Sequence, residues 1–113
     1  MTHQNLLSIA KEHGSPVYVY DAEKIESQYK RLTGAFKKVK NLRINYAVKA
    51  LSNLAVLQLI HGFGAGMDTV SIQEVRLALA AGIDPSKIMF TPNGVSLDEL
   101  EKGMLGRGLI EMT

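Results

Sequence analysis

The fold can be inferred from one stretch, RINYAVKALSNLAVLQLIHGFGAGMDTVS, residues 43–71. Residues 43–48 at its start are mostly apolar and predict a strand. Residues 53–61 carry apolar side chains at helical spacing, and 65–69 form a second short apolar run. A strand, a helix and a second strand in this order predict one β/α unit of a parallel sheet.

The same alternation extends toward the C-terminus, and shorter elements precede it. The patterns predict helices over 4–13, 22–38 (with Asp21 as N-cap), 71–81 and 96–104, and strands over 17–20, 88–90 and 109–111. Strands from residue 43 onward recur about every 20 residues, which gives about three β/α units. The predicted fold class is therefore α/β, the N-terminal part of a (β/α)8 TIM-like barrel. A small open α/β domain that folds alone is the alternative.

Length and composition limit the possible functions. The chain has 113 residues, whereas a closed eight-unit barrel needs about 250. Its net charge of +2 is too mild to indicate a nucleic-acid or membrane-surface partner. The absence of cysteine excludes disulfides and thiolate chemistry within this chain. The three histidines are scattered, so no metal site is predicted. The absence of a long apolar run or a signal-like start predicts a cytoplasmic protein.

Lys49 is the first candidate for chemistry. It follows the strand at 43–48, at the end where barrel enzymes place their reactive groups. Strand alternation predicts that Asn45, Ala47 and Lys49 share one face. If that face looks into a barrel, the lysine is desolvated, its amine loses a proton more easily, and it can attack an aldehyde. The alternative is a lysine that ends a strand and points to water.

The glycine-rich stretch GFGAG at 62–66 is the second candidate region. Its alternating glycines resemble a dinucleotide loop only superficially, because a helix precedes them and a strand follows. Asp68 falls near the end of the strand at 65–69, on the same predicted rim as Lys49. Ser71 and Glu74 have the spacing of a capping box and need no functional explanation. In the turn at 91–94, Asn93 is a further candidate pocket residue on this rim.

Three motifs together resemble the start of the fold-type III pyridoxal-phosphate decarboxylases. They are PVYVYD at 16–21, YAVKA at 46–50 and GAGMDTVSIQE at 64–74, and the agreement of order and spacing covers about 15–96. The resemblance implies that pyridoxal 5'-phosphate is the cofactor and that Lys49 carries it as an internal aldimine. It also implies that Asp68 lies on the cofactor-facing rim, where the position of Asn93 in the sequence makes it a further candidate for cofactor binding.

The resemblance implies a two-domain enzyme. Residues 1–21 would contribute a helix and a strand to a mostly β domain, and 22–113 would form a partial barrel without its phosphate-binding half. The branch that the motifs match best decarboxylates meso-2,6-diaminopimelate to L-lysine and acts as a homodimer. Because the remaining active-site residues of the family lie beyond the matched part, we expect the 113 residues alone to be inactive.

Other functions remain open at this stage. A related decarboxylase of ornithine, arginine or carboxynorspermidine would share the lysine motif. An amino-acid racemase of the same fold type fits the Asp-Ser-Glu element less well. A non-catalytic, truncated α/β module is the alternative from a different class, since an unpaired parallel sheet edge favours association.

Overall fold

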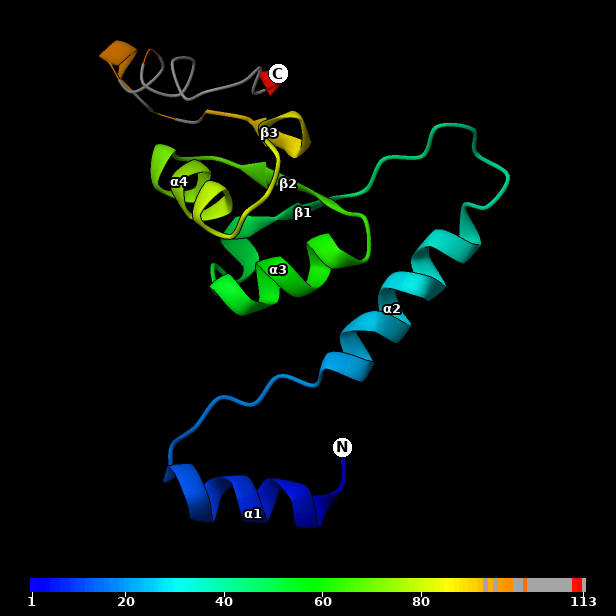
Figure 1. Ribbon diagram of the computed structural model, residues 1–113, viewed down its shortest axis with the longest axis vertical. Helices are drawn as coiled ribbons and strands as arrows, with labels where there is room; N and C mark the ends of the chain where they lie inside the picture. The colour runs from blue at the N-terminus through cyan, green and yellow to red at the C-terminus, as the bar shows by residue number, and fades with distance from the viewer. Residues whose placement is uncertain (93, 95, 99–100, 102–110, 113) are drawn as a thin grey trace.

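The computed structural model describes residues 1–92, 94, 96–98, 101 and 111–112, and Figure 1 shows their arrangement. The helices are α1 (His3–His13), α2 (Ala22–Ala35), α3 (Leu54–Gly62) and α4 (Ile72–Ala80). The strands are β1 (Asn45–Ala47), β2 (Gly66–Thr69), β3 (Ile88–Phe90) and β4 (Glu111–Met112). There are two 3-10 turns. The turn η1 (Val48–Ala50) follows β1, and the turn η2 (Pro85–Lys87) precedes β3.

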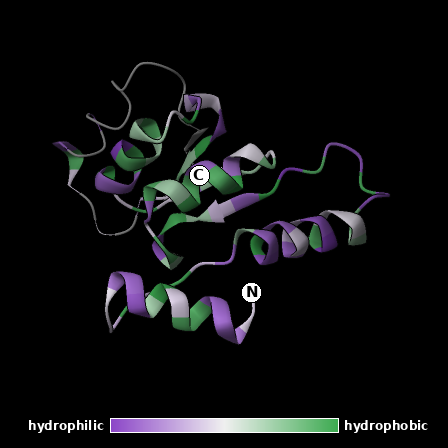
Figure 2. Ribbon diagram, turned by 60° about the horizontal axis from the view of Figure 1, so that its bottom comes forward, coloured by the Kyte–Doolittle hydropathy of each residue, from purple (hydrophilic) through white to green (hydrophobic). Residues whose placement is uncertain are grey.

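Helices α1 and α2 precede the sheet. The prediction of α1 is confirmed, including its end at Gly14, which has a φ of 85° and donates its N–H to the carbonyl of Ala10. Both helices carry hydrophobic and hydrophilic residues interspersed along their length (Figure 2), and neither contains a buried residue. Leu6, Leu7 and Leu32 are exposed, whereas Ile25 and Tyr29 of α2 are partly buried against a second, smaller cluster of Val56, Ile60 and Ala65.

The segment between α1 and α2 corrects one prediction. Residues 17–20 were expected to form a strand, but no strand is assigned to them. Tyr18 is 88% exposed there, which places this segment outside the packed part of the chain. A strand requires a neighbour to accept and donate its backbone hydrogen bonds. No described strand of this chain pairs with 17–20, and the expected strand is therefore wrong for this chain.

The β/α units after α2 agree well with the sequence patterns. The four strands form one parallel sheet in the order β1-β2-β3-β4. Strand β3 has the predicted bounds, and β1 and β2 are shorter than predicted. Helix α2 ends at Ala35 instead of residue 38. Of the helix predicted over 96–104, residues 97, 98 and 101 are helical, and 99–100 and 102–104 lie outside the described residues.

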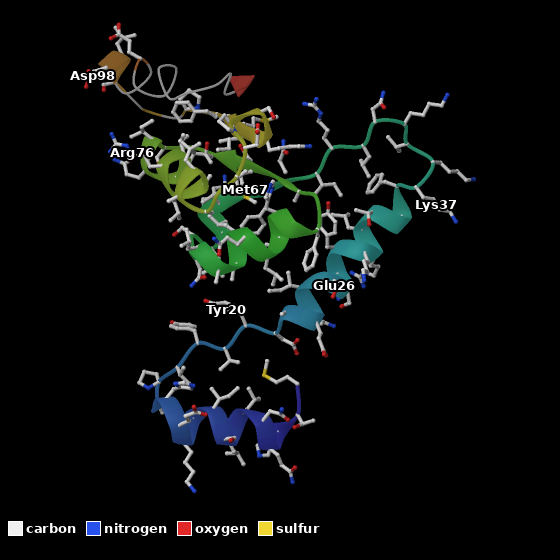
Figure 3. The ribbon with its side chains drawn as sticks, viewed as in Figure 1. Tyr20, Glu26, Lys37, Met67, Arg76 and Asp98 are labelled. Carbon is white, nitrogen blue, oxygen red and sulfur yellow. The ribbon has the colours of Figure 1, made fainter. Side chains whose placement is uncertain are left out.

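Helices α3 and α4 cover one face of the sheet. Alternate residues of β2 and β3 point toward them, and Met67 lies on this side (Figure 3). Burial identifies the main core, which consists of Val48, Leu57, Met67, Ile72, Val75, Ala78, Ala81, Ile83, Ile88 and Phe90. The opposite face carries the half-buried Asp68 and Met89, and no described helix covers it. A helix layer on one side of a parallel sheet is the arrangement of a barrel wall.

The start of α2 gives a prediction about acid stability. Asp21 caps α2 by accepting a hydrogen bond from the N–H of Lys24 at 3.1 Å, as predicted, and it pairs with the N-terminal ammonium at 3.1 Å. The Lys24 hydrogen bond first, and then the N-terminus, lower the pKa of this carboxyl below 3.8. Its contribution to stability is complete above that value and is lost as pH falls through the lower folded pKa.

Replacing Asp21 by Asn keeps an acceptor for the cap but removes the charge. We therefore expect wild type to be more stable than Asp21→Asn at neutral pH, and the difference to shrink in acid. Urea midpoints measured across the acid range test this. A difference that stays constant down to the most acidic pH would show that the charge of Asp21 contributes nothing.

No helix among the described residues is long and apolar enough to cross a membrane. Over the described residues the chain is an α/β fold in which two β/α units, β1-α3 and β2-α4, are followed by β3 in the same parallel sheet, as at the start of a barrel wall.

A candidate active-site rim at the carboxyl ends of the strands

Lys49 lies directly after β1, on the 3-10 turn η1. Strand β1 ends at Ala47, and the side chain of Val48 is fully buried in the main core. The strand alternation predicted to place Lys49 beside Asn45 and Ala47 therefore stops before the lysine. Lys49 is exposed in this chain, and the desolvation expected for a lysine inside a barrel stays a prediction for a closed barrel. The position at the carboxyl end of β1, however, is the one predicted.

Two contacts hold the turn that presents Lys49. The N–H of Leu51 donates to the carbonyl of Val48 at 3.1 Å. The hydroxyl of Tyr46 donates to the carbonyl of Leu51 at 3.4 Å, and Tyr46 packs against the main core and against the smaller cluster of Val56, Ile60 and Ala65. Burial, and secondarily the neighbouring Tyr20, raise the pKa of Tyr46, so its hydroxyl stays protonated as a donor. The lysine thus extends from a turn whose two ends are fixed.

Asp68 lies on the helix-free face of the sheet, in the strand next to β1. Parallel pairing aligns Ala47 with Asp68 and Asp68 with Met89, so these residues form one row across three strands. Lys49 comes two residues after Ala47, and Thr91 comes two residues after Met89. Asp68 therefore lies between the strand ends that carry Lys49 and Thr91.

A hydroxyl group holds the Asp68 carboxylate. Thr91 Oγ1 donates to Asp68 Oδ1 at 3.2 Å, and the N–H of Thr91 donates to the carbonyl of Thr69 at 2.8 Å. The backbone bond extends the β2–β3 pairing by one step and places Thr91 beside Asp68. The sequence predicted a turn over 91–94 with Asn93 as a candidate pocket residue, and the role of Thr91 was not predicted. The signal was available, because Thr91 follows Met89 by two residues and so shares its face.

Of the other residues considered from the sequence, two have a structural role and one lies outside the described residues. Ser71 caps α4 by accepting from the N–H of Glu74 at 3.3 Å. The Glu74 carboxylate accepts from the N–H of Val70 at 2.8 Å, one residue before the position that a capping box would use. Both residues are therefore structural, as predicted. Asn93 lies outside the described residues.

Two hollows in the surface do not coincide with this rim. A cavity of about 210 Å³ lies at the amino ends of the strands and is lined by Arg43, Asn45, Gly66, Ser86 and Lys87 among others. A groove of about 340 Å³ lies between α2 and β1, with Ile25, Tyr29, Leu32, Tyr46 and Ile60 in its walls. Neither is lined by Lys49 or Asp68. In this chain the rim is therefore an open surface.

A comparison with known protein families shows which family this chain belongs to. A family profile described as the pyridoxal-binding domain of pyridoxal-dependent decarboxylases matches residues 22–107. The chain belongs to this family. The match covers α2, the two β/α units β1-α3 and β2-α4, β3 and the segment after it. The resemblance found in the three motifs is thereby confirmed, and the family implies pyridoxal 5'-phosphate as the cofactor.

The chain is similar to several diaminopimelate decarboxylases. It is 42% identical over 96 residues to the one from Methanothermobacter thermautotrophicus, covering 84% of this chain and 22% of that protein. It is 42% identical over 100 residues to the one from Helicobacter pylori, covering 88% and 24%. The crystal structure of the Helicobacter pylori enzyme complexed with L-lysine matches with a TM-score of 0.81 and 37% identity, over 98% of this chain and 27% of that one.

The same fold occurs in a lysine/ornithine decarboxylase from Vibrio vulnificus, with a TM-score of 0.81 at 22% identity. At this identity the match shows the fold alone. The chain spans only 22–24% of the length of the curated relatives described here. What those proteins do as a whole therefore depends on much sequence that has no counterpart in these 113 residues.

The residues on the rim fit one end of pyridoxal phosphate. Lys49 supplies a primary amine, the group that reacts with an aldehyde, and it is exposed and held by a fixed turn. Asp68 supplies a carboxylate acceptor on the adjacent strand β2. Arg43 and Lys87, two cations that a phosphate could use, line the cavity at the opposite edge of the sheet. Within the described part of the chain, the rim thus fits the aldehyde end of the cofactor, and a phosphate site has not been found there.

Proposed function

We propose that this chain supplies the N-terminal, cofactor-lysine part of a decarboxylase that converts meso-2,6-diaminopimelate to L-lysine. The position of Lys49 supports this most strongly, because it follows the first barrel strand on the rim where barrel enzymes react. The two relatives at 42% identity bear the name diaminopimelate decarboxylase, which favours this substrate over ornithine, arginine or carboxynorspermidine.

We further propose that the chain contributes to two domains of the complete enzyme. Residues 22–113 form the partial barrel, and 1–21 belong to a second, mostly β domain. The exposed segment 17–20 and the exposed apolar residues of α1 support this division, because neither is covered within the chain. We also propose that the complete enzyme is a homodimer. A cytoplasmic location stays a prediction from the sequence.

Each rim residue has a defined task in the proposed reaction. Bound pyridoxal phosphate supplies an electron sink for the pair left when the substrate loses its carboxylate. Lys49 would hold the cofactor through its amine. As a free amine, it could hold or move a proton at Nζ. Asp68 presents a carboxylate on the neighbouring strand, where it can accept hydrogen bonds from cationic or N–H groups.

These residues do not make a complete site. The rim is open to water, and water weakens the electrostatic interactions on which such chemistry depends. The rest of the site would come from sequence comparable to the other three quarters of the relatives. We therefore expect the 113 residues alone to release no carbon dioxide from meso-diaminopimelate, and turnover by the purified chain would contradict this.

A fusion protein tests the proposed function. The matched 100-residue segment of the Helicobacter pylori relative is replaced by the corresponding segment of this chain. We expect the fusion to restore growth without lysine to a bacterium that lacks its own diaminopimelate decarboxylase. The purified fusion is then assayed for carbon dioxide release from meso-diaminopimelate, ornithine and arginine, with the unmodified relative as reference.

The outcomes separate the proposal from its alternatives. Release from meso-diaminopimelate supports it. A fusion that folds and binds the cofactor but shifts its preference to ornithine or arginine favours a related decarboxylase. A folded fusion that acts on none of the three substrates contradicts the proposal and favours a non-catalytic module.

A further inference from the structure

Strand β1 lies at the edge of the sheet, and its outer side has no partner strand among the described residues. The N–H of Gly66 in β2 donates to the carbonyl of Ile44 at 2.9 Å, so this carbonyl points toward β2. Backbone groups point to alternate sides along a strand, which turns those of Tyr46 toward β2 and those of Asn45 and Ala47 away from it. Asn45 and Ala47 thus present N–H and carbonyl groups to a further strand.

Helix α2 extends the helix layer beyond this edge. It packs beside α3, where the rings of Tyr29 and Phe63 lie 5.7 Å apart, and its Ile25 packs against the smaller cluster (Figure 1). The groove of about 340 Å³ separates α2 from β1, with Tyr29 and Leu32 in one wall and Tyr46 in the other. A free sheet edge beside an apolar groove and a flanking helix is shaped to receive a strand.

The free edge of β1 sets the register of a parallel strand that binds it. In the β1–β2 pair, Gly66 lies opposite Asn45, and its N–H donates to the preceding residue, Ile44. The same pattern on the outer side makes one residue of the new strand donate to the carbonyl of Asn45 and accept from the N–H of Ala47. That residue lies opposite Tyr46 and shares its face, so its side chain enters the groove and has to be apolar.

We propose that the groove between α2 and β1 is the closing seam of the barrel, where a parallel strand from the rest of the enzyme binds β1 and α2 covers that strand. A closed barrel has no free edge, so its first strand needs such a partner. The chain spans only 22–24% of the length of its curated relatives, and sequence comparable to their remainder can supply the strand. This seam follows from the fold of the family and from no choice of substrate.

Ala47→Pro tests the seam through a comparison of the 113-residue chain with the fusion protein described above. Proline removes the N–H that the new strand would bond, and the φ of Ala47, −71°, already suits a ring that fixes φ at about −65°. The chain alone should therefore melt at the wild-type temperature or slightly above it. In the fusion we expect the melting temperature to fall by about 2–4 °C, the shift for one lost backbone hydrogen bond. Ala47→Ser keeps the N–H and should melt like wild type in both proteins.

Leu32→Gln tests the α2 wall of the groove in the same way. Leu32 is 45% exposed in the chain, so a polar side chain there should change the melting temperature little. In the fusion the substitution buries an unpaired amide against the new strand, and the melting temperature should fall by at least about 2 °C. Leu32→Met keeps an apolar side chain and should behave like wild type in both proteins. A fusion as tolerant of Leu32→Gln as the chain is would show that α2 does not cover the strand.

Amide hydrogen exchange of the fusion covers the case in which the chain or a variant does not fold. The N–H of Ala47 should exchange at least about tenfold more slowly than an amide in an unfolded chain. Exchange of Ala47 at the unfolded rate, or equal melting shifts for Ala47→Pro in chain and fusion, would overturn the proposal. A dimer of the chain that Ala47→Pro dissociates, with no effect of this variant in the fusion, would assign the edge to a second copy and overturn it as well. Because none of these measurements involves pyridoxal phosphate, a fusion with a protected Ala47 that fails to decarboxylate would count against the proposed function alone.

Discussion

Replacing Lys49 by alanine is expected to abolish both covalent cofactor attachment and decarboxylation in the fusion protein. The amine of Lys49 is the group on the rim that can bind an aldehyde, and alanine leaves nothing in its place. We expect carbon dioxide release to fall by a factor on the order of 10³ or more, as when an enzyme loses its nucleophile. Stability should change little, because Lys49 is exposed.

Two further variants decide whether the loss comes from the amine or from the charge. Lys49→Arg keeps the positive charge but cannot form the same covalent link, so it should be as inactive as Lys49→Ala. Lys87→Ala removes an exposed lysine from η2, at the opposite edge of the sheet, and should keep full activity. Substantial activity in either Lys49 variant, measured at saturating cofactor, would show that another residue holds the cofactor.

Gly66→Ala is expected to destabilise the chain by about 1–3 kcal/mol, the usual cost of overpacking. Gly66 begins β2, and a Cβ there would meet the side-chain oxygen of Asn45 and lie 2.7 Å from the backbone carbonyl of Lys87. Asn45 lies across this glycine, with its amide 3.9 Å from the sulfur of Met89. The added methyl group therefore has to displace the Asn45 side chain and the backbone of η2.

Gly62→Ala is the matched control for this prediction. Gly62 is the last residue of α3, and a Cβ there would meet nothing within 4 Å. Alanine at this position should leave stability unchanged or raise it by up to about 1 kcal/mol. Urea unfolding of both variants provides the comparison. Equal stabilities for Gly66→Ala and Gly62→Ala would mean that the strands at the amino edge are not packed as described.

Asn45→Ala separates the two contacts. Removing the amide relieves one of them but leaves the Lys87 carbonyl in place. The double variant Asn45→Ala/Gly66→Ala should therefore recover only part of the lost stability relative to Asn45→Ala alone. Full recovery would indicate that the backbone of η2 moves more easily than its position suggests.

Local patterns were sufficient for much of the fold. Strand β3 could be bounded to the residue because turn-forming segments enclose a short apolar run. Capping residues marked the starts of helices, and Asp21 and Ser71 cap α2 and α4 as predicted. The β/α order then indicated a parallel sheet, since parallel strands require crossover connections.

Predictions that depended on distant contacts were less accurate. The turn at η1 forms where Val48 enters the core between the sheet and its helices, and the sequence pattern alone continued the strand through it. The hydrogen bond from Thr91 to Asp68 joins residues 23 positions apart and depends on the register of β2 with β3. The segment 17–20 has strand-forming residues, but strand formation also requires a partner.

The proposal that Lys49 holds the cofactor is tested most directly by finding which lysine reacts with it. The fusion protein is incubated with pyridoxal phosphate, reduced with borohydride, digested and analysed by peptide mass spectrometry. If Lys49 holds the cofactor, the reduced cofactor is found on Lys49, and Lys11, Lys87 and the other lysines are labelled only at background level. A fusion that decarboxylates meso-diaminopimelate while its label lies on a different lysine would contradict the role of Lys49.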